Sequence, residues 1–586
     1  MIKLLKLYSI PRTFDPIEFK DGVNLILGEK FSETKSSSRK DKKTNGVGKS
    51  ISIEFINFCL FKDADSSRVT KIPFDKFAYE AKICLDLIIN NKKITIERTI
   101  NEPDKPSIEI NGEITLYKNI DDALSYLTNI FYEGNKENDL EKPSFRELIG
   151  PLIRDENSEF QNIVNCYDLK EKIPNSDLIK THLYLFGINP IFVKEIKKIF
   201  KQIEEKSQTQ GHLRKRLTES GRKKISDVKA ELNALELELS RVEDSLDKFR
   251  TEPIFQQNQN TLVKIDSDIE KLRIKQIALK YELKRIESMP KVENINTGDI
   301  QIIYNKFKEG LGQIVSKSIN EVLDFKKKIE KYQNLLINER ADEIRLNIQS
   351  IQEELNNLDE KRAGILIHID KKDSLGVLKE SFYTYTKRKD EHATTQANLD
   401  EYERVDREIG IIKLKKDNLF SELDTKIFEI NTTIKDFNKT MANIHAYIMG
   451  NAEVNFDIET IKTLSSKQII KLDLRIPDDG SHSVNRTKVF IYDIGLMLNN
   501  HTQKRHPMFL IHDNIFDVDQ DTLIQSLNFL AEQEEKNNFQ YILTLNRDKI
   551  ENEEKKEEIK LKIKEHTRAS FNRKNRFLKV DYKELD

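Results

Sequence analysis

Four stretches in the middle of the chain repeat apolar residues at alternating steps of three and four. The clearest seam consists of Ile225, Val228, Leu232, Leu235, Leu239, Val242, Leu246 and Phe249. Similar seams run over residues 262–286, 344–358 and 420–437, and the first of these contains one polar residue, Gln276. Apolar residues at this spacing, flanked by charged ones, predict helices that pair as a coiled coil. Four ordinary amphipathic helices in a bundle are the alternative.

Three interruptions divide this helical region, near residues 251–258, 290–298 and 366–376. They indicate several helical passes and leave open which interruption forms the distal tip. Charged residues make up 34% of the chain and hydrophobic residues 37%, and Trp is absent. This composition is typical of a globular part joined to long solvated helices.

Segments typical of α/β structure flank the helices on both sides. IKLLKLYSI and VNLILG read as strands, and an apolar helix follows residue 50. Alternating segments then predict a meander with turns at Asn90-Asn91 and Asn111-Gly112. Beyond residue 447, PMFLIHD and QYILTL favour a parallel sheet with both faces covered. The sequence predicts an α/β fold whose head is split into residues 1–190 and 447–586, with an arm over residues 191–446.

The segment from Gly28 to Ser50 combines a strand end with a phosphate-binding motif. Its last residues are Asn45, Gly46, Val47, Gly48, Lys49 and Ser50, which lack only the first glycine of such a loop. In this motif backbone N–H groups and a helix N-terminus hold phosphates, the Lys reaches the β/γ oxygens and the Ser ligates Mg²⁺. Gly28 ends the strand where the loop should open. Residues 29–44 are then an insertion, whose closure costs of order a few kcal/mol at most.

A carboxylate at the end of a buried strand is the second part of such a site. PMFLIHD ends in Asp513, which would hold Mg²⁺ through water opposite Ser50. A buried strand that simply ends in a turn Asp is the alternative. A metal-dependent nuclease would also use paired carboxylates, and Asp517 and Asp519, which directly follow this strand, make it the less favoured alternative.

The whole layout resembles the SMC/RecF/RecN group of coiled-coil, ABC-type ATPases. TNGVGKS, FLIHDNIFDVD and YILTLN look most like the ATPase subunit of bacterial antiphage systems of the ABC-three-component or Lamassu-like kind. The resemblance covers the entire chain and implies a split ABC-type head with a long antiparallel coiled-coil insertion. It further implies ATP and Mg²⁺ as cofactors, and a homodimer whose heads enclose two ATP molecules.

The resemblance also assigns catalytic positions, and the chain departs from two of them. A catalytic Glu is expected after Asp513, where the chain has Asn514. An amide cannot take a proton from water, so general-base catalysis there is lost. Asp517 could substitute, or hydrolysis is slow. Asn546 stands where the resemblance places a switch histidine.

The resemblance also assigns further site positions, for which the local sequence motifs are weaker. Asp519 is the expected D-loop residue. Ser481 and Ser483, in a turn without the usual paired glycines, are the expected signature residues that contact the other subunit's ATP. Gln161 would be the Q-loop glutamine near the metal, with an ordinary surface glutamine as the alternative.

The charge pattern bears on partners. The chain has 98 Lys+Arg and 99 Asp+Glu residues, so any DNA surface must be local. Basic clusters at residues 35–43, 214–224 and 568–576 predict salt-dependent contacts with double-stranded DNA. No apolar run reaches the roughly 18 residues of a membrane span. The three cysteines form no metal or disulfide pattern, and we expect a cytoplasmic protein.

These features predict an ATP-dependent DNA sensor or clamp that hydrolyses ATP slowly. By the resemblance it would control a nuclease-type effector, with small accessory subunits, in bacterial antiphage defence. A DNA-repair ATPase that works with a nuclease subunit on DNA ends is the first alternative. A structural protein with a vestigial nucleotide motif is the second.

Overall fold

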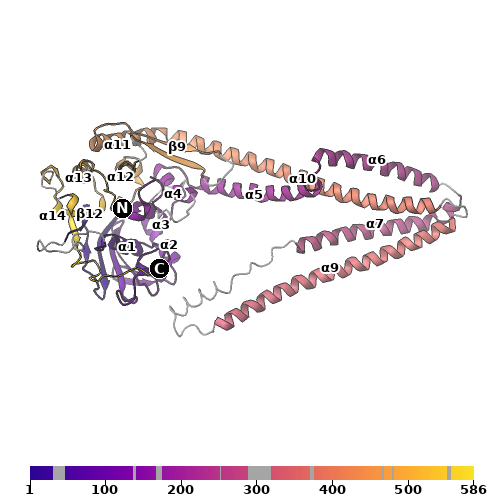
Figure 1. The fold of residues 1–586 in the computed structure, drawn as a ribbon, viewed down its shortest axis with the longest axis horizontal. Helices are drawn as coiled ribbons and strands as arrows, with labels where there is room; N and C mark the ends of the chain where they lie inside the picture. The colour runs from indigo at the N-terminus through magenta and orange to yellow at the C-terminus, as the bar shows by residue number, and fades with distance from the viewer. Residues whose placement is uncertain are drawn as a thin grey trace. The chain divides into compact units, whose positions relative to one another are not determined.

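The structure is a computed structural model that describes residues 1–30, 46–135, 140–166, 175–250, 253–287, 319–369, 375–462, 468–477, 481–550 and 556–585. The chain divides into two compact units. The first, which we call the head, joins Met1–Glu204 to Ile411–Asp586, and the second, the arm, spans Glu205–Gly410. Figure 1 shows the sheets in the head and long helices in the arm. None of the helices in the described ranges is long and apolar enough to cross a membrane.

A five-stranded parallel sheet in the head draws its strands from both ends of the chain. The strands are β3 (Gly22–Gly28), β8 (Ile153–Arg154), β11 (Phe509–Asp513), β12 (Gln540–Asn546) and β13 (Thr567–Phe571). Their order is β13-β3-β12-β11-β8, and every neighbouring pair is parallel. Because β3 lies between β13 and β12, neither end of the chain could build this sheet without the other.

A six-stranded antiparallel sheet holds the predicted meander. Its strands are β1 (Ile2–Ile10), β2 (Ile17–Glu18), β4 (Lys82–Ile89), β5 (Lys92–Arg98), β6 (Ser107–Ile110) and β7 (Glu113–Leu116), in the order β2-β1-β4-β5-β6-β7. Asn90, Asn91 and Asn111 have φ values of 47°, 66° and 53°. Asn tolerates this left-handed backbone, so the two predicted turns are confirmed.

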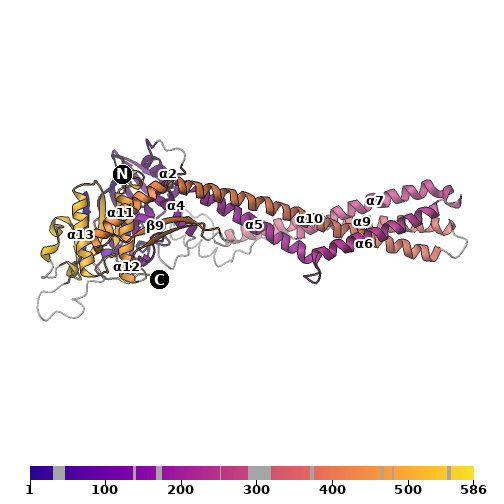
Figure 2. The same cartoon turned by 90° about the horizontal axis from the view of Figure 1, so that it is seen from above.

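Helices cover both faces of the parallel sheet. Leu25 and Leu510 point into one core, and their neighbours Ile26 and Ile511 point into the other. This alternation buries both sides of each strand and explains the uninterrupted apolar runs. The helices of the first core include α4 (Asn175–Phe186), α11 (Asn431–Met449), α12 (His482–Leu498) and α13 (Gln520–Glu534), and α1 (Lys49–Cys59) lies in the second core. Figures 1 and 2 show α11, α12 and α13 together on one side of the head.

Shorter elements complete the described part of the head. They are α2 (Ile120–Phe131), α3 (Phe145–Ile149), α14 (Ile563–His566), the hairpin of β9 (Asn455–Thr460) and β10 (Ile470–Arg475), and short 3-10 turns such as η3 (Glu156–Ser158). The turn η3 directly follows β8 and so lies at the same edge of the sheet as the end of β11.

The arm consists of paired helices. Its helices are α6 (Ile225–Arg250), α7 (Pro253–Glu287) and α9 (Ile319–Ile369), together with parts of α5 (Ile191–Leu217) and α10 (Leu375–Glu429). Val228 and Leu232 of α6 pack against Leu399 of α10. The second pair, α7 and α9, is joined by the cluster of Ile265, Ile269, Ile351 and Leu355. The seams of α6, α7 and α9 therefore face partner helices, as predicted. The fourth predicted seam does not belong to the arm: Phe420, Leu423, Ile434 and Phe437 lie in the core of the head, and the helix is interrupted at Ile430 between α10 and α11.

Contacts across each pair establish that the helices are antiparallel. Lys229 and Arg388 form ion pairs of 2.5 Å with Glu403 and Glu238, so residue numbers rise on α6 as they fall on α10. On the second pair, Asp266 and Glu282 of α7 form ion pairs with Arg362 and Arg340 of α9, so the residue numbers again run in opposite directions. The polar seam residue Gln276 donates to Gln352 on α9 at 2.9 Å. The predicted α/β class, with a split head and an antiparallel coiled-coil insertion, is confirmed.

The three predicted interruptions have different outcomes. The first was predicted over residues 251–258, but α7 begins at Pro253, a residue that suits a first helical turn, so residues 253–258 are helical. In the third, residues 366–369 belong to α9 and residues 375–376 to α10, so these positions are helical as well. Residues 251–252, 290–298 and 370–374 lie outside the described residues.

Candidate nucleotide site

The carboxyl ends of three adjacent strands define the candidate site. β3 ends at Gly28, which pairs with Asn546 at the end of β12, and β11 ends at Asp513 beside Thr544 of β12. Parallel α/β sheets bind ligands at this edge. The helix α1 begins at Lys49 and follows the loop that starts after Gly28. Four sequence-predicted residues thus come from one edge of the sheet.

Glycines shape the described part of the loop. Gly46 and Gly48 have φ values of 75° and 109°, which side chains rarely tolerate. A Cβ atom on Gly48 would lie 2.5 Å from Cβ of Phe577. At Gly28 a Cβ atom would lie 3.0 to 3.1 Å from the end of the Lys49 side chain. Gly28 therefore gives Lys49 its space, while Asn45 lies outside the described residues.

Lys49 is buried at the start of α1, with 7% of its surface exposed. Its Nζ donates a hydrogen bond to Oδ1 of Asn546. Burial lowers the pKa of Lys49, and the negative charges of Asp513 and Glu156 oppose that effect. A buried ammonium group with few hydrogen-bond partners is well suited to an oxyanion such as phosphate. Asn546, where a switch residue is expected from the resemblance, thus contacts Lys49 directly.

Asp513 is also buried, with 1% of its surface exposed. Its Oδ1 accepts a hydrogen bond from the Thr544 hydroxyl at 2.5 Å. Burial raises the pKa of Asp513, and hydrogen bonds from Thr544 and Ser50 oppose the rise. The other oxygen, Oδ2, is buried and has no complete hydrogen bond within the described residues. A buried carboxylate oxygen beside a serine hydroxyl is a good ligand pair for Mg²⁺ or its bound water.

Asn514 and Glu156 form a pair next to these residues. Nδ2 of Asn514 donates to Oε1 of Glu156 at 3.2 Å, and Asn514 has a φ of 60°. Its carbonyl accepts from Arg486 of α12 at 2.7 Å. Glu156 was not predicted from the sequence. Its position depends on the two-residue strand β8, which pairs with β11 and is too short to show any periodicity.

A cavity of about 520 Å³ adjoins the start of α1. Its lining includes Gly46, Val47, Gly48, Lys49, Ser50, Ile51, Arg68, Glu156 and Asn514. The rest of the lining is the C-terminal segment, with Arg576, Phe577, Leu578, Val580, Asp581, Tyr582, Lys583 and Glu584. ATP and Mg²⁺ fit this donor set: the glycine loop and Lys49 would hold phosphate oxygens, and Ser50 with Asp513 would hold the metal. Bound Mg²⁺ would neutralise charge on the phosphates.

The structure does not bring every predicted residue to this cavity. Asp517 forms an ion pair of 2.9 Å with Lys549, a contact that lowers the pKa of Asp517. Asp519 caps α13 by accepting from the Thr522 backbone at 2.9 Å. Gln161 is exposed and donates to Glu159 at 2.6 Å. None of these three predicted residues belongs to the lining that the described residues outline.

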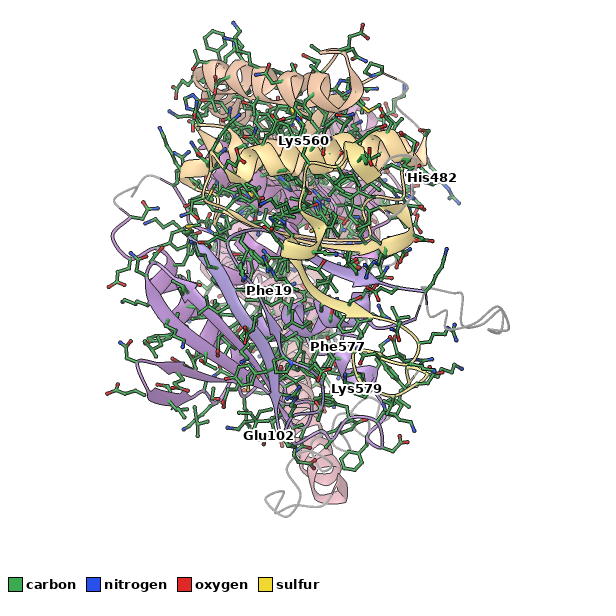
Figure 3. All side chains as sticks on the ribbon, turned by 90° about the vertical axis from the view of Figure 1, so that its left-hand side faces the viewer. Phe19, Glu102, His482, Lys560, Phe577 and Lys579 are labelled. Carbon is green, nitrogen blue, oxygen red and sulfur yellow. The ribbon has the colours of Figure 1, made fainter. Side chains whose placement is uncertain are left out.

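The two predicted signature serines lie at the start of α12. Ser481 is the N-cap of this helix and accepts from the Val484 backbone at 3.3 Å. Its hydroxyl is 3.4 Å from that of Ser483. Figure 3 shows His482, between the two serines, at the edge of the head. Neither serine lines the cavity of its own chain, as outlined by the described residues.

A buried polar network connects α12 to the strand ends behind the site. Asp493 of α12 accepts from Arg154 at 2.5 and 3.0 Å and lies 2.9 Å from Nε2 of His512. Burial opposes ionisation of Asp493, but Arg154 and His512 outweigh it, so the pKa of Asp493 is lowered. Arg154 precedes the turn that carries Glu156, and His512 precedes Asp513. The network therefore links α12 rigidly to both acidic residues of the site.

Comparisons with known proteins give relatives without an established function. Residues 444–582 match the sequence model of a family described as an uncharacterised protein conserved in bacteria (DUF2326). The chain is 25% identical over 581 residues to the uncharacterized protein YydD of Bacillus subtilis strain 168, and the match covers 90% of each chain.

Two solved structures align with most of the chain. One is the Smc head domain with a coiled coil and joint from Pyrococcus yayanosii, at 14% identity and a TM-score of 0.31, covering 94% of this chain and 93% of that one. The other is the Smc head domain with an extended coiled coil, bound to the C-terminal domain of ScpA, from Pyrococcus furiosus, at 12% identity and a TM-score of 0.29, covering 94% and 91%. We therefore base the function on the geometry of the site itself.

Proposed function

We propose that this protein is an SMC-like ATP-binding protein and slow ATPase, and that two copies pair through their heads around ATP. The arrangement of Lys49, Ser50 and Asp513 is the observation that carries this proposal. A buried ammonium faces a buried carboxylate at a helix N-terminus, and Asp513 keeps one oxygen without a complete hydrogen bond. Such a site favours an anion that arrives with a divalent cation, as Mg²⁺-ATP does.

Slow hydrolysis follows from the side chains near the start of α1. Asn514 cannot accept a proton, so the carboxylate that lines the cavity, Glu156, is the better base. Glu156 would take a proton from water as the water oxygen attacks the γ-phosphorus. The bond from this phosphorus to the β–γ bridging oxygen breaks, and ADP leaves with the electron pair. One oxygen of Glu156 already accepts a hydrogen bond from Asn514, which leaves the other oxygen for the attacking water. Asp517 remains the second candidate base.

The signature turn would act on the partner subunit. Ser481 and Ser483 lie at the start of a 17-residue helix, where backbone N–H groups and the helix dipole favour an anion. In a head-to-head dimer this end of α12 would contact the γ-phosphate held by the partner's loop, with Asp519 nearby as the D-loop residue. ATP bound by one subunit would then hold the other subunit through these contacts.

The remaining partners are proposed from charge and resemblance. Arg214, Lys215 and Arg216 are exposed at the end of α5. Such a cluster supports sequence-independent contacts with double-stranded DNA. We assign the chain the role of a cytoplasmic DNA sensor or clamp whose closed state controls a nuclease-type effector and accessory subunits in antiphage defence.

The molar mass of the purified chain in solution tests this function. Light scattering after size exclusion would be compared without nucleotide, with ATP and Mg²⁺, and with both plus linear double-stranded DNA. We expect dimers with ATP, and monomers without it or with Lys49→Ala. An oligomeric state unaffected by ATP, with and without DNA, would overturn the proposal.

One observation favours the alternative of a DNA-repair ATPase. Glu156 supplies a carboxylate in the lining of the cavity, and a carboxylate can act as a base for faster hydrolysis. Measured ATP turnover separates the two functions. Strong stimulation by DNA ends would support the repair enzyme, and tight binding with slow turnover supports the sensor.

A further inference from the structure

The C-terminal segment after β13, residues 572–585, lies against the phosphate-binding loop. The backbone N–H of Phe577 donates to the carbonyl of Val47 at 3.2 Å. Phe577 is 1% exposed, and its ring lies 4.4 Å from that of Phe14 and 5.2 Å from that of Phe55 on α1. Figure 3 shows Phe577 and Lys579 on this segment, below β13. The core therefore fixes the segment beside the loop.

Two further contacts hold the end of the segment. Arg68, nine residues after the last residue of α1, donates to Oε1 of Glu584 through Nε at 2.9 Å and Nη2 at 2.6 Å. The backbone N–H of Leu585 donates to the carbonyl of Lys71 at 2.8 Å. Lys579 forms an ion pair with Asp15, in the connection between β1 and β2. The segment is thus tied to three other parts of the head, at Arg68, Lys71 and Asp15.

Two groups of residues with different chemistry line the cavity. The loop glycines, Lys49, Ser50 and Glu156 suit phosphates and a metal. The rest of the lining consists of Arg68 and residues of the C-terminal segment between Arg576 and Glu584. Tyr582 in this second group is partly exposed, and its ring packs at the edge of the second core. Burial raises the pKa of Tyr582 to about 12, so its hydroxyl stays protonated and can donate.

We propose that residues 576–584 and Arg68 form the nucleoside subsite of the cavity, with Tyr582 as the aromatic surface for the base. This inference rests on the proposed ATP binding: a nucleotide whose phosphates bind the glycine loop and Lys49 has its ribose and base against the remaining lining of the same cavity. An aromatic face binds any base by stacking, while Arg68 and Glu584 offer a donor and an acceptor at its edge. The ligand class is a nucleoside triphosphate rather than a bare polyphosphate.

Binding of two probes to the full chain tests this assignment. The probes are ATP and inorganic tripolyphosphate, each with Mg²⁺, measured by titration calorimetry. Tyr582→Ala should weaken ATP binding roughly tenfold and leave tripolyphosphate binding unchanged, because stacking with the base is lost. Tyr582→Phe keeps the ring and should retain most of the affinity. Leu585→Ala, at a neighbouring exposed residue that does not line the cavity, is the matched control.

The outcomes separate this inference from the proposed function. If Tyr582→Ala weakens both probes equally, or leaves ATP binding unchanged, the nucleoside subsite is refuted while ATP binding stands. If the wild-type chain binds neither probe, the proposed function fails and the subsite with it. The melting temperature of each variant, measured without ligand, shows whether a loss of binding reflects unfolding.

Discussion

Asp513 combines burial with an incomplete set of hydrogen bonds. A buried carboxylate oxygen without a partner costs about 1–3 kcal/mol in the absence of a cation. We therefore expect Asp513→Asn to raise the free energy of unfolding of the ligand-free chain by about 1 kcal/mol. The same variant should lose the stabilisation that Mg²⁺-ATP gives the wild type, since binding raises stability only while the site is intact. Thermal unfolding with and without Mg²⁺-ATP measures both effects. Destabilisation of the ligand-free variant would show that Asp513 has a structural role instead.

Replacing Glu156 should lower the rate of ATP turnover strongly, whereas replacing Asp517 should change it little. Glu156→Gln keeps the size and hydrogen bonding of the side chain but removes the proton acceptor. We expect it to lower the turnover rate by roughly 10²-fold or more, with ATP affinity retained. Asp517→Asn should have a small effect, because Asp517 is paired with Lys549 away from the cavity.

Single-turnover hydrolysis and equilibrium ATP binding, measured on the two variants in parallel, distinguish the roles. If Asp517→Asn abolishes hydrolysis and Glu156→Gln does not, the base is Asp517, as the sequence suggested. Loss of ATP binding in Glu156→Gln would instead assign Glu156 to metal or phosphate binding.

His182 makes the stability of the head depend on pH. Burial lowers the pKa of His182 to about 4 from its ordinary value of 6.5, and Nδ1 lies 2.9 Å from the Tyr492 hydroxyl. Between these values the unfolded chain binds a proton that the folded chain does not. The contribution to stability is complete above pH 6.5 and is lost as the pH falls towards 4, by up to roughly 1.4 kcal/mol per pH unit.

Replacing His182 should flatten this dependence. We expect His182→Phe to reduce the slope of unfolding free energy against pH, whatever its effect on the absolute stability. An unchanged slope in His182→Phe would mean that His182 titrates normally in the folded chain.

At the level of single residues, the sequence predicted those candidate site residues that belong to a contiguous motif. Lys49 and Ser50 follow two glycines, and Asp513 ends an apolar run. Glu156 and Tyr582 carry no comparable signal, because they reach the cavity through a two-residue strand and an irregular segment. Only the three-dimensional structure places such residues near the loop.

At the level of helices, a substitution of Gln276 tests how α7 and α9 pair in the arm. It interrupts the seam of α7, is 7% exposed, and lies near the apolar contacts of α7 with α9. A polar seam residue fixes register at a cost in stability. We expect Gln276→Leu to stabilise the α7–α9 pair by about 1 kcal/mol, because its partner Gln352 is exposed and can bond to water.

Amide hydrogen exchange of α7 and α9 in the full chain measures this effect, since it reports local opening. Gln349→Leu, at an exposed position of α9, is the control and should change protection little. Faster exchange in Gln276→Leu would show that the Gln276–Gln352 hydrogen bond contributes more than burial of leucine.

Elements with strong periodicity or long apolar runs were predicted from the sequence. The strands β3, β11 and β12, the meander and the arm helices belong to this group. The sequence could not give the order of the parallel strands, because β12 lies between β3 and β11 although it follows both in the chain. That order results from the packing of two cores on one sheet.

At the scale of the whole molecule, the sheet makes the head one cooperative unit from two distant segments. The pairing of β3 with β12 and β13 brings Lys49 to Asp513 across the entire arm sequence. A nucleotide bound at this edge would therefore stabilise the junction of the two chain halves. The arm lies in the sequence between these two halves.

Equilibrium binding of ATP with Mg²⁺ to the purified chain is the most direct test of this account. Titration calorimetry of the wild type beside Lys49→Ala would be measured at one salt concentration. We predict saturable binding by the wild type and roughly ten- to hundredfold weaker binding by Lys49→Ala, because a charge-assisted contact with phosphate is removed. Absence of saturable binding by the wild type, or equal affinity of the two proteins, would contradict the nucleotide site.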